Sequence, residues 1–95
     1  SLEEFIEADT SLQELLHQDY EFTVGQVIWA IRFEMARTIE DILARRIRLL
    51  FLDAQACLDI TEKVADIITK ELNKSNNWKQ NQIQEFKTLA SGYLI

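Results

Sequence analysis

Apolar residues recur at helical spacing after Phe22, and this is the clearest pattern in the chain. They stand three and four positions apart, at Val24, Val27, Ile28, Ile31 and Met35. Side chains with this spacing share one face of a helix. Thr23 and Gln26 have the form of a capping box, in which each side chain bonds the other residue's backbone amide. Phe22 and Val27 take the hydrophobic staple positions around it. We therefore predict a helix that begins after Thr23.

Thr38 stands where this helix could continue or a new one could begin. Its hydroxyl can cap a helix, and Asp41 follows three residues later, at the position whose side chain can return the bond. We predict a break or kink at residues 36–38.

The longest periodic stretch runs from about residue 48 to residue 72, and we predict a single helix over it. Its inward positions are Leu49, Leu52, Ala56, Ile60, Val64, Ile67 and Ile68. Cys57 lies among small apolar neighbours in this stretch, which predicts a buried thiol.

A polar turn at residues 74–77 precedes the last predicted helix. Asn77 is its predicted cap, with Gln80 at the box position. Gly92 near its end permits a terminating turn. The predicted buried stripe of this helix is Ile83, Phe86, Leu89, Ala90 and Tyr93.

Periodicity is weaker in the first part of the chain. A small apolar patch predicts a short helix there, at Leu2, Phe5 and Ile6. Thr10–Gln13 has capping-box form and predicts a second short helix, to about Leu16. Residues 17–21 lack a helical period, so we predict a loop in which His17 is exposed.

These segments predict an all-α fold, an irregular bundle of about four to five helices in a single domain that spans residues 1–95. The apolar share of 47% is ordinary for a globular protein. The chain has no proline, and its only glycines are Gly25 and Gly92. An all-β or doubly wound fold needs more turn residues than this.

Composition excludes several functions. The formal charge of −6 disfavours nucleic acid and a polybasic grip on an anionic membrane. A lone cysteine rules out an internal disulfide and a cysteine zinc site, and the lone His17 is a poor candidate for a metal ligand. The longest apolar runs, such as Leu49–Leu52, are far shorter than the ~20 residues that span a bilayer. The first residues are acidic and carry no targeting signal.

The sequence also lacks the glycine-rich turn that brings backbone amides onto a dinucleotide pyrophosphate. This chain therefore does not bind FAD by that route. We assign it no catalytic, cofactor-binding or metal-binding residue. Because it begins without an initiator methionine, we expect it to be a piece of a longer protein.

Charged residues alternate in sign along one stripe if residues 34–46 are helical. The stripe is Glu34, Arg37, Asp41 and Arg45, and Arg46 adjoins it. Beside it lies an expected buried stripe of Ile31, Met35, Ile39 and Ile42. All the arginines of the chain fall in or beside this segment, whereas all the lysines follow it.

Two interpretations explain this charge ladder. Surface ion pairs worth roughly 0.3–0.5 kcal/mol each produce the same pattern. Arginine's planar fork, however, suits partly desolvated pairing with carboxylates better than lysine does. Our hypothesis is a domain interface formed by Glu34, Arg37, Asp41, Arg45 and Arg46. Trp29, which lies off the apolar stripe, could mark a surface that meets another domain.

Three parts of the sequence carry a resemblance to a known family. They are Glu34-x-x-Arg37-x-x-x-Asp41-x-x-x-Arg45-Arg46 followed by Leu49-Leu50-Phe51-Leu52-Asp53-Ala54, the upstream Tyr20-x-Phe22-Thr23-Val24-x-x-Val27, and the downstream Phe86-Lys87-x-Leu89-Ala90-x-Gly92-Tyr93-Leu94. In order and spacing they resemble the C-terminal helical domain of FAD-dependent glycerol-3-phosphate dehydrogenase. Ile47 departs from the pattern, because a capping threonine is expected after the paired arginines.

The resemblance implies a parent enzyme that oxidises sn-glycerol 3-phosphate to dihydroxyacetone phosphate, with FAD taking the hydride and a membrane quinone taking the electrons. This chain would be an accessory cap packed on the parent's N-terminal FAD and substrate domain, with subunit contacts as a further role. FAD belongs to the parent and not to this fragment. The implied location is cytoplasmic, with the parent peripheral at the inner face of a bacterial membrane. The alternative is a stand-alone helical protein-interaction module, which composition leaves open.

Overall fold

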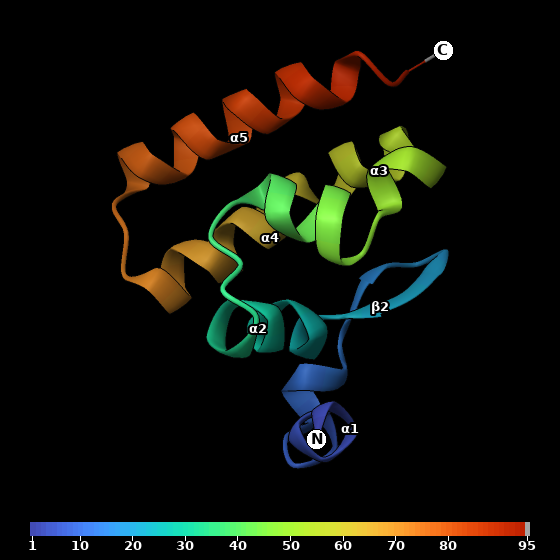
Figure 1. Cartoon of the computed structure of the whole chain (residues 1–95), viewed down its shortest axis with the longest axis vertical. Coiled ribbons are helices and arrows are strands. Elements are labelled where there is room, and N and C mark those ends of the chain that lie inside the picture. The colour runs from blue at the N-terminus through green and yellow to red at the C-terminus, as the bar shows by residue number, and fades with distance from the viewer. Residues whose placement is uncertain (95) are drawn as a thin grey trace.

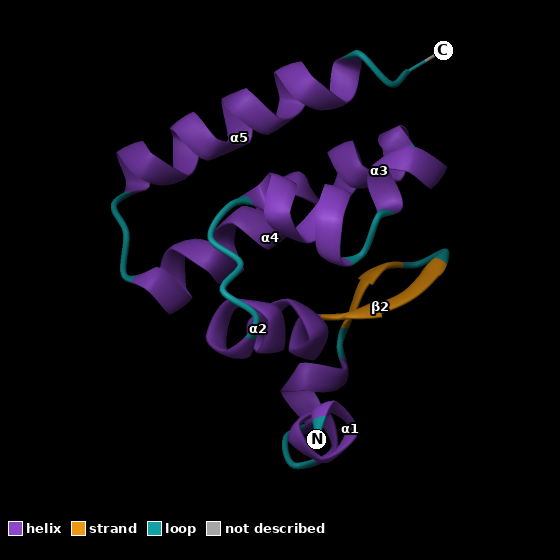
Figure 2. Cartoon of the chain, in the orientation of Figure 1, coloured by secondary structure: helices purple, strands orange, loops and turns teal. Residues whose placement is uncertain are grey.

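The computed structural model describes residues 1–94, and most of them are helical (Figures 1 and 2). The elements in chain order are α1 (Leu2–Glu7), the 3-10 turn η1 (Thr10–Gln13), the strands β1 (Leu15–His17) and β2 (Tyr20–Thr23), α2 (Val24–Phe33), the π-helical segment η2 (Asp41–Arg46), α3 (Leu49–Leu52), α4 (Ala54–Leu72) and α5 (Asn76–Ser91). The predicted all-α class is confirmed, with a small two-stranded sheet added to it.

The core is organised around α4, which buries one face along its whole length. Figure 1 shows α5 folding back along α4, while α2 packs against another side of it. The buried positions of α4 include the predicted Ala56, Ile60, Val64 and Ile68, spaced by one helical turn. Cys57 is also fully buried, as predicted.

The two capping boxes around α2 and η2 form as the sequence predicts. The Gln26 amide donates to Thr23 Oγ1 at 3.2 Å, and the Thr23 amide donates to Gln26 Oε1 at 2.8 Å. The Asp41 amide likewise donates to Thr38 Oγ1 at 3.1 Å, and the Thr38 amide donates to Asp41 Oδ2 at 3.2 Å. The predicted break at residues 36–38 is therefore present, because Thr38 begins a new helical segment.

The prediction of a loop at residues 17–21 was wrong. β1 and β2 form an antiparallel hairpin, with Leu15 opposite Thr23 and His17 opposite Tyr20. The hairpin is held by contacts distant in sequence, since the Tyr20 hydroxyl donates to Asp53 Oδ2 at 2.9 Å. The side chain of His17 is largely buried and lies 3.3 Å from Asp59 Oδ2, so its predicted exposure was also wrong. The helix predicted to reach Leu16 is the 3-10 turn η1, which Asp9 caps.

The single helix predicted over residues 48–72 was also wrong. Asp53 has φ −158° and divides it into α3 and α4, and its carboxylate accepts the Ala56 amide at 2.9 Å. The first amides of a helix have no partner within the helix, and an N-cap aspartate accepts a hydrogen bond from one of them. The cap at Asp53 therefore marks the start of a separate helix. Because α3 is a separate turn, Leu52 points outward instead of inward.

Two details of the last helix differ from the predictions. Ser75, not Asn77, caps α5, because its Oγ accepts the Trp78 amide at 3.1 Å. Tyr93 lies beyond the helix end and is exposed, whereas Ile83, Phe86 and Ala90 are buried as predicted.

Candidate domain-interface site

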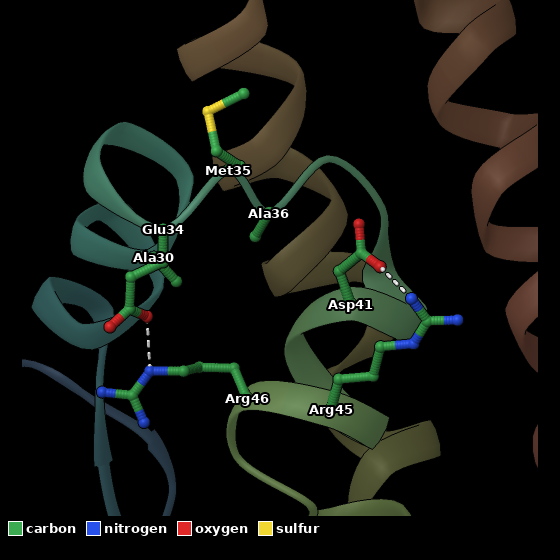
Figure 3. A pocket seen from close by; sticks show the side chains of 7 residues that line it. All are labelled: Ala30, Glu34, Met35, Ala36, Asp41, Arg45 and Arg46. Atoms are coloured by element: carbon green, nitrogen blue, oxygen red, sulfur yellow. Dashed lines mark hydrogen bonds and ion pairs between the residues drawn. The ribbon is translucent and has the colours of Figure 1, made fainter.

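An open pocket lies between the end of α2 and η2, with a volume of about 530 Å³. Figure 3 shows Met35 at one end of it and the two arginines of η2 at the other. The residues that line it are Ala30, Glu34, Met35, Ala36, Asp41, Arg45 and Arg46. Four of the five predicted interface residues are therefore brought together here. Arg37 is not among the residues that line it.

The wall of the pocket begins where α2 ends. Glu34 and Ala36 both donate their amides to the carbonyl oxygen of Ala30, at 3.0 and 3.1 Å. Between them, Met35 has φ 65°, in the left-handed region. A left-handed residue commonly ends a helix, but it is usually glycine, because a side chain costs roughly 1–2 kcal/mol there. The reversal turns the Met35 side chain outward and buries Ala36.

Arg37 does not take the place predicted for it in the charge ladder. Its Nη1 donates to the carbonyl oxygens of Ile31 at 2.9 Å and Ala36 at 2.7 Å. Its Nη2 lies 3.7 Å from Met35 Sδ. The prediction of a charge stripe on one helix was wrong here, because α2 ends at Phe33 and its last carbonyls need donors. Arg37 supplies a donor to one of them, the carbonyl of Ile31, and ties it to the carbonyl of Ala36 in the turn that follows.

Asp41 likewise serves the backbone first. Its Oδ2 accepts the amides of Arg37 at 2.9 Å and of Thr38 at 3.2 Å. A carboxylate beside the first amides of a helical segment is well placed, because those amides lack partners within the segment.

The remaining predicted residues form ion pairs, one between α2 and η2 and the others within the η2 segment. Arg46 Nε lies 2.6 Å from Glu34 Oε1, which ties η2 to the end of α2. Arg45 is 3.6 Å from Asp41 and 3.7 Å from Glu40, and 74% of its side chain is exposed. An exposed pair at such distances contributes about 0–1 kcal/mol. Arg45 is thus held loosely, and Arg46 is held in a good geometry.

The π-helical winding of η2 places these arginines. The Ile47 amide donates to the carbonyl of Ile42 at 2.8 Å, five residues back. Such turns are rare and often occur at functional sites. Arg48 then adopts φ 64° and ends the segment. A helix break is therefore present at this point even though Ile47 replaces the expected threonine.

The sequence analysis missed one member of the site. Met35 was predicted to be buried beside Ile31, Ile39 and Ile42, and only those three are buried. The error came from extending the helical period past Phe33. The predicted break at residues 36–38 was the signal that could have corrected it.

A second group of titratable residues lies where the hairpin meets α4. The bonds from the Ala56 amide and the Tyr20 hydroxyl lower the pKa of Asp53. The same bond raises the pKa of Tyr20. Burial raises the pKa of the Cys57 thiol to about 12. Tyr20 and Asp53 are bonded to each other, and within residues 1–94 no set of three His, Cys, Asp or Glu side chains is arranged to hold a metal.

Trp29 packs in an aromatic cluster with α1. Its ring centroid lies 5.4 Å from that of Phe5 and 4.5 Å from that of Phe33. The proposed contact of Trp29 with another domain stays a prediction. Among the described helices, none combines the length and apolar character needed to cross a membrane.

Comparison with known proteins gives a consistent result. Residues 2–82 match the family described as the C-terminal domain of alpha-glycerophosphate oxidase. The chain is 34% identical over 74 residues to the mitochondrial glycerol-3-phosphate dehydrogenase of Schizosaccharomyces pombe, covering 78% of this chain and 11% of that protein. It is 32% identical over 66 residues to the Saccharomyces cerevisiae protein of the same name, covering 70% of this chain and 10% of that protein. The chain thus spans about a tenth of the length of these relatives. No solved structure matches it.

Proposed function

Because this chain belongs to the family of the C-terminal domain of alpha-glycerophosphate oxidase, we propose that it is the accessory C-terminal domain of an FAD-dependent glycerol-3-phosphate dehydrogenase. The parent oxidises sn-glycerol 3-phosphate to dihydroxyacetone phosphate, and its FAD passes the electrons to a quinone. The observation that carries the proposal is the family match over residues 2–82. The names of the fungal relatives support it.

The described residues do not themselves fit FAD. Neither glycine has the positive φ that a phosphate-cradling turn uses. Gly25 is helical, and an added Cβ would lie 2.6 Å from Ile6 and 2.8 Å from the Leu12 carbonyl, so its open side is already filled by the chain. The strands form an antiparallel pair without the strand-to-helix crossover of a dinucleotide fold. Flavin and substrate chemistry are therefore assigned to the rest of the parent.

The role that we assign to this chain is a cap that docks on the catalytic body. The pocket between α2 and η2 is the proposed docking face, with Glu34, Asp41, Arg45 and Arg46 on its surface and Arg37 supporting it. Two features support this choice, the π-helical segment and the exposed Met35. The same cap could also form contacts between subunits. For location, we propose a peripheral parent at the inner face of a bacterial membrane, although the named relatives are mitochondrial.

The test is to express the full reading frame that contains this domain. The purified protein should carry flavin absorbance and oxidise sn-glycerol 3-phosphate with an artificial electron acceptor. A variant that lacks residues 1–95 should lose thermal stability or subunit assembly. A full-length protein without flavin and without this oxidation would contradict the proposal and favour a stand-alone interaction module.

A further inference from the structure

Met35 combines two features that do not stabilise the domain by itself. Its side chain is apolar and 71% exposed. Its backbone has φ 65°, a conformation that glycine or asparagine adopts at lower cost. Residues held in sparsely populated conformations persist when their surroundings over-determine them, and they cluster at functional sites.

The surroundings of Met35 do fix it. The Ala30 carbonyl accepts the amides on both sides of it, from Glu34 and Ala36. Arg37 holds the following peptide through the Ala36 carbonyl and approaches Met35 Sδ to 3.7 Å. The side chain therefore projects from a rigid turn at the edge of the pocket (Figure 3). The fixed backbone holds the base of the side chain at this edge of the pocket, and the flexible methionine side chain adapts to irregular apolar surfaces.

We propose that Met35 is the anchor through which this domain docks on the preceding part of its own parent chain, inserting into an apolar hollow there. The inference rests on the proposed function. If the chain is the C-terminal domain of such a dehydrogenase, the parent is about ten times longer than this chain, and most of the parent precedes the domain. The chain enters through α1, whose Phe5 lies 6.3 Å from Phe33, two residues before Met35. The preceding part of the parent would thus join this domain close to the end of α2, where Met35 lies.

The charges around the pocket define the rest of the partner surface. Glu34 and Arg46 neutralise each other at 2.6 Å. Arg45 has only long contacts with Glu40 and Asp41 and is largely exposed. It is free to bind a further carboxylate, and arginine suits such a contact at the rim of an interface. The expected partner surface is therefore an apolar hollow with an acidic residue at its edge.

A second exposed apolar group serves as the matched control. Leu52 on α3 is 75% exposed, and Phe51 and Tyr93 beside it form an edge-to-face pair at 5.6 Å. Figure 1 shows α3 and the end of α5 at the opposite end of the long axis from α1. Leu52 thus matches Met35 in exposure and apolar character, but it lies away from the chain entry and has no left-handed backbone.

The experiment places a photoreactive amino acid at position 35 or position 52 of the full-length protein and maps the cross-linked peptides. We expect position 35 to cross-link to the preceding part of the same chain, with a yield that exceeds that from position 52 by about tenfold. Dilution before irradiation separates links within a chain from links between chains. Links from position 35 to a second copy, or equal yields from the two positions, would overturn the inference.

A pair of substitutions provides a second measurement. Met35→Lys should raise the rate of proteolysis between this domain and the rest of the parent by about tenfold, which converts to about 1.4 kcal/mol, within the range of interface residues whose truncation is costly. Leu52→Lys should leave it unchanged, and equal rates in the two variants would count against the anchor. Flavin content and glycerol 3-phosphate oxidation of the unsubstituted protein are measured separately. Their absence would contradict the proposed function, whereas their presence without a position-35 link would contradict only this inference.

Discussion

The most decisive perturbation of the site is Arg37→Ala, because the ladder hypothesis and the structure give different results for it. As a surface ion pair, Arg37 would contribute less than about 0.5 kcal/mol to the free energy of unfolding. In the structure, its Nη1 donates to the Ile31 and Ala36 carbonyls at 2.9 and 2.7 Å. Both bonds are part-buried and hold the turn that ends α2.

The magnitude follows from these two bonds. A hydrogen bond from a charged donor contributes about 1.5–3 kcal/mol when it is shielded from water. Arg37 is itself exposed, and water can reach the carbonyls once the side chain is removed, so we discount this to about 1–2 kcal/mol for the pair. For a domain of this size, such a loss lowers the melting midpoint by roughly 4–16 °C.

The assay is urea denaturation of the purified chain, monitored by circular dichroism at low salt and at about 1 M NaCl. At the higher salt concentration the screening length falls to about 3 Å. Arg45→Ala is the control, because its ion pairs are long and exposed. We expect Arg45→Ala to cost less than about 0.5 kcal/mol and to lose that effect in salt. The Arg37→Ala loss should persist in salt, and Arg37→Lys should recover part of it, because an ammonium can reach one carbonyl.

Equal, salt-sensitive losses in Arg37→Ala and Arg45→Ala would refute the assignment of Arg37 to the helix end and restore the ladder. The same Arg37→Ala loss is expected in the full-length protein, because both carbonyl partners belong to this domain. A loss confined to the full-length protein would instead place Arg37 in the interface itself.

Three further predictions test the fold. Thr23→Ala removes one half of the capping box and should cost about 1 kcal/mol, seen as a lower urea midpoint that Thr23→Ser largely restores. Gly25→Ala should destabilise the domain by about 1–3 kcal/mol despite alanine's higher helix propensity, because the new Cβ would lie 2.6 Å from Ile6 and 2.8 Å from the Leu12 carbonyl. A shift in Trp29 fluorescence should accompany that loss, and an unchanged midpoint would show that α1 and η1 can move aside. The Cys57 thiol should resist a thiol reagent at neutral pH until urea unfolds the chain, because burial raises its pKa from 9.0 to about 12. Its contribution to stability is present below pH 9.0 and is lost as the pH rises towards 12, since the unfolded thiol ionises first. A Cys57→Ala variant has no thiol to ionise, so its free energy of unfolding should fall less between pH 9.0 and about 12.

The sequence by itself determined the features that depend on neighbours within one helical turn. The helical class, the capping boxes at Thr23 and Thr38 and the buried stripe of α4 were all predicted. Each depends on residues three or four positions apart, whose relation a helix fixes before any other element packs against it. The domain interface itself stays a prediction, although four of its five proposed residues line one pocket.

Tertiary structure decided the features whose partners are distant in the sequence. Residues 15–23 form a hairpin that is held in place because Tyr20 bonds Asp53, thirty-three positions later, and His17 contacts Asp59. The exposure of Met35 follows from the end of α2, which Arg37 closes by reaching back six residues to the Ile31 carbonyl. Hydrophobic periodicity does not reveal such bonds, because the same polar residue is compatible with a position inside a helix and with a position that caps a helix end. The packed chain selects the cap, since carbonyls that the end of α2 leaves without helical partners must find donors.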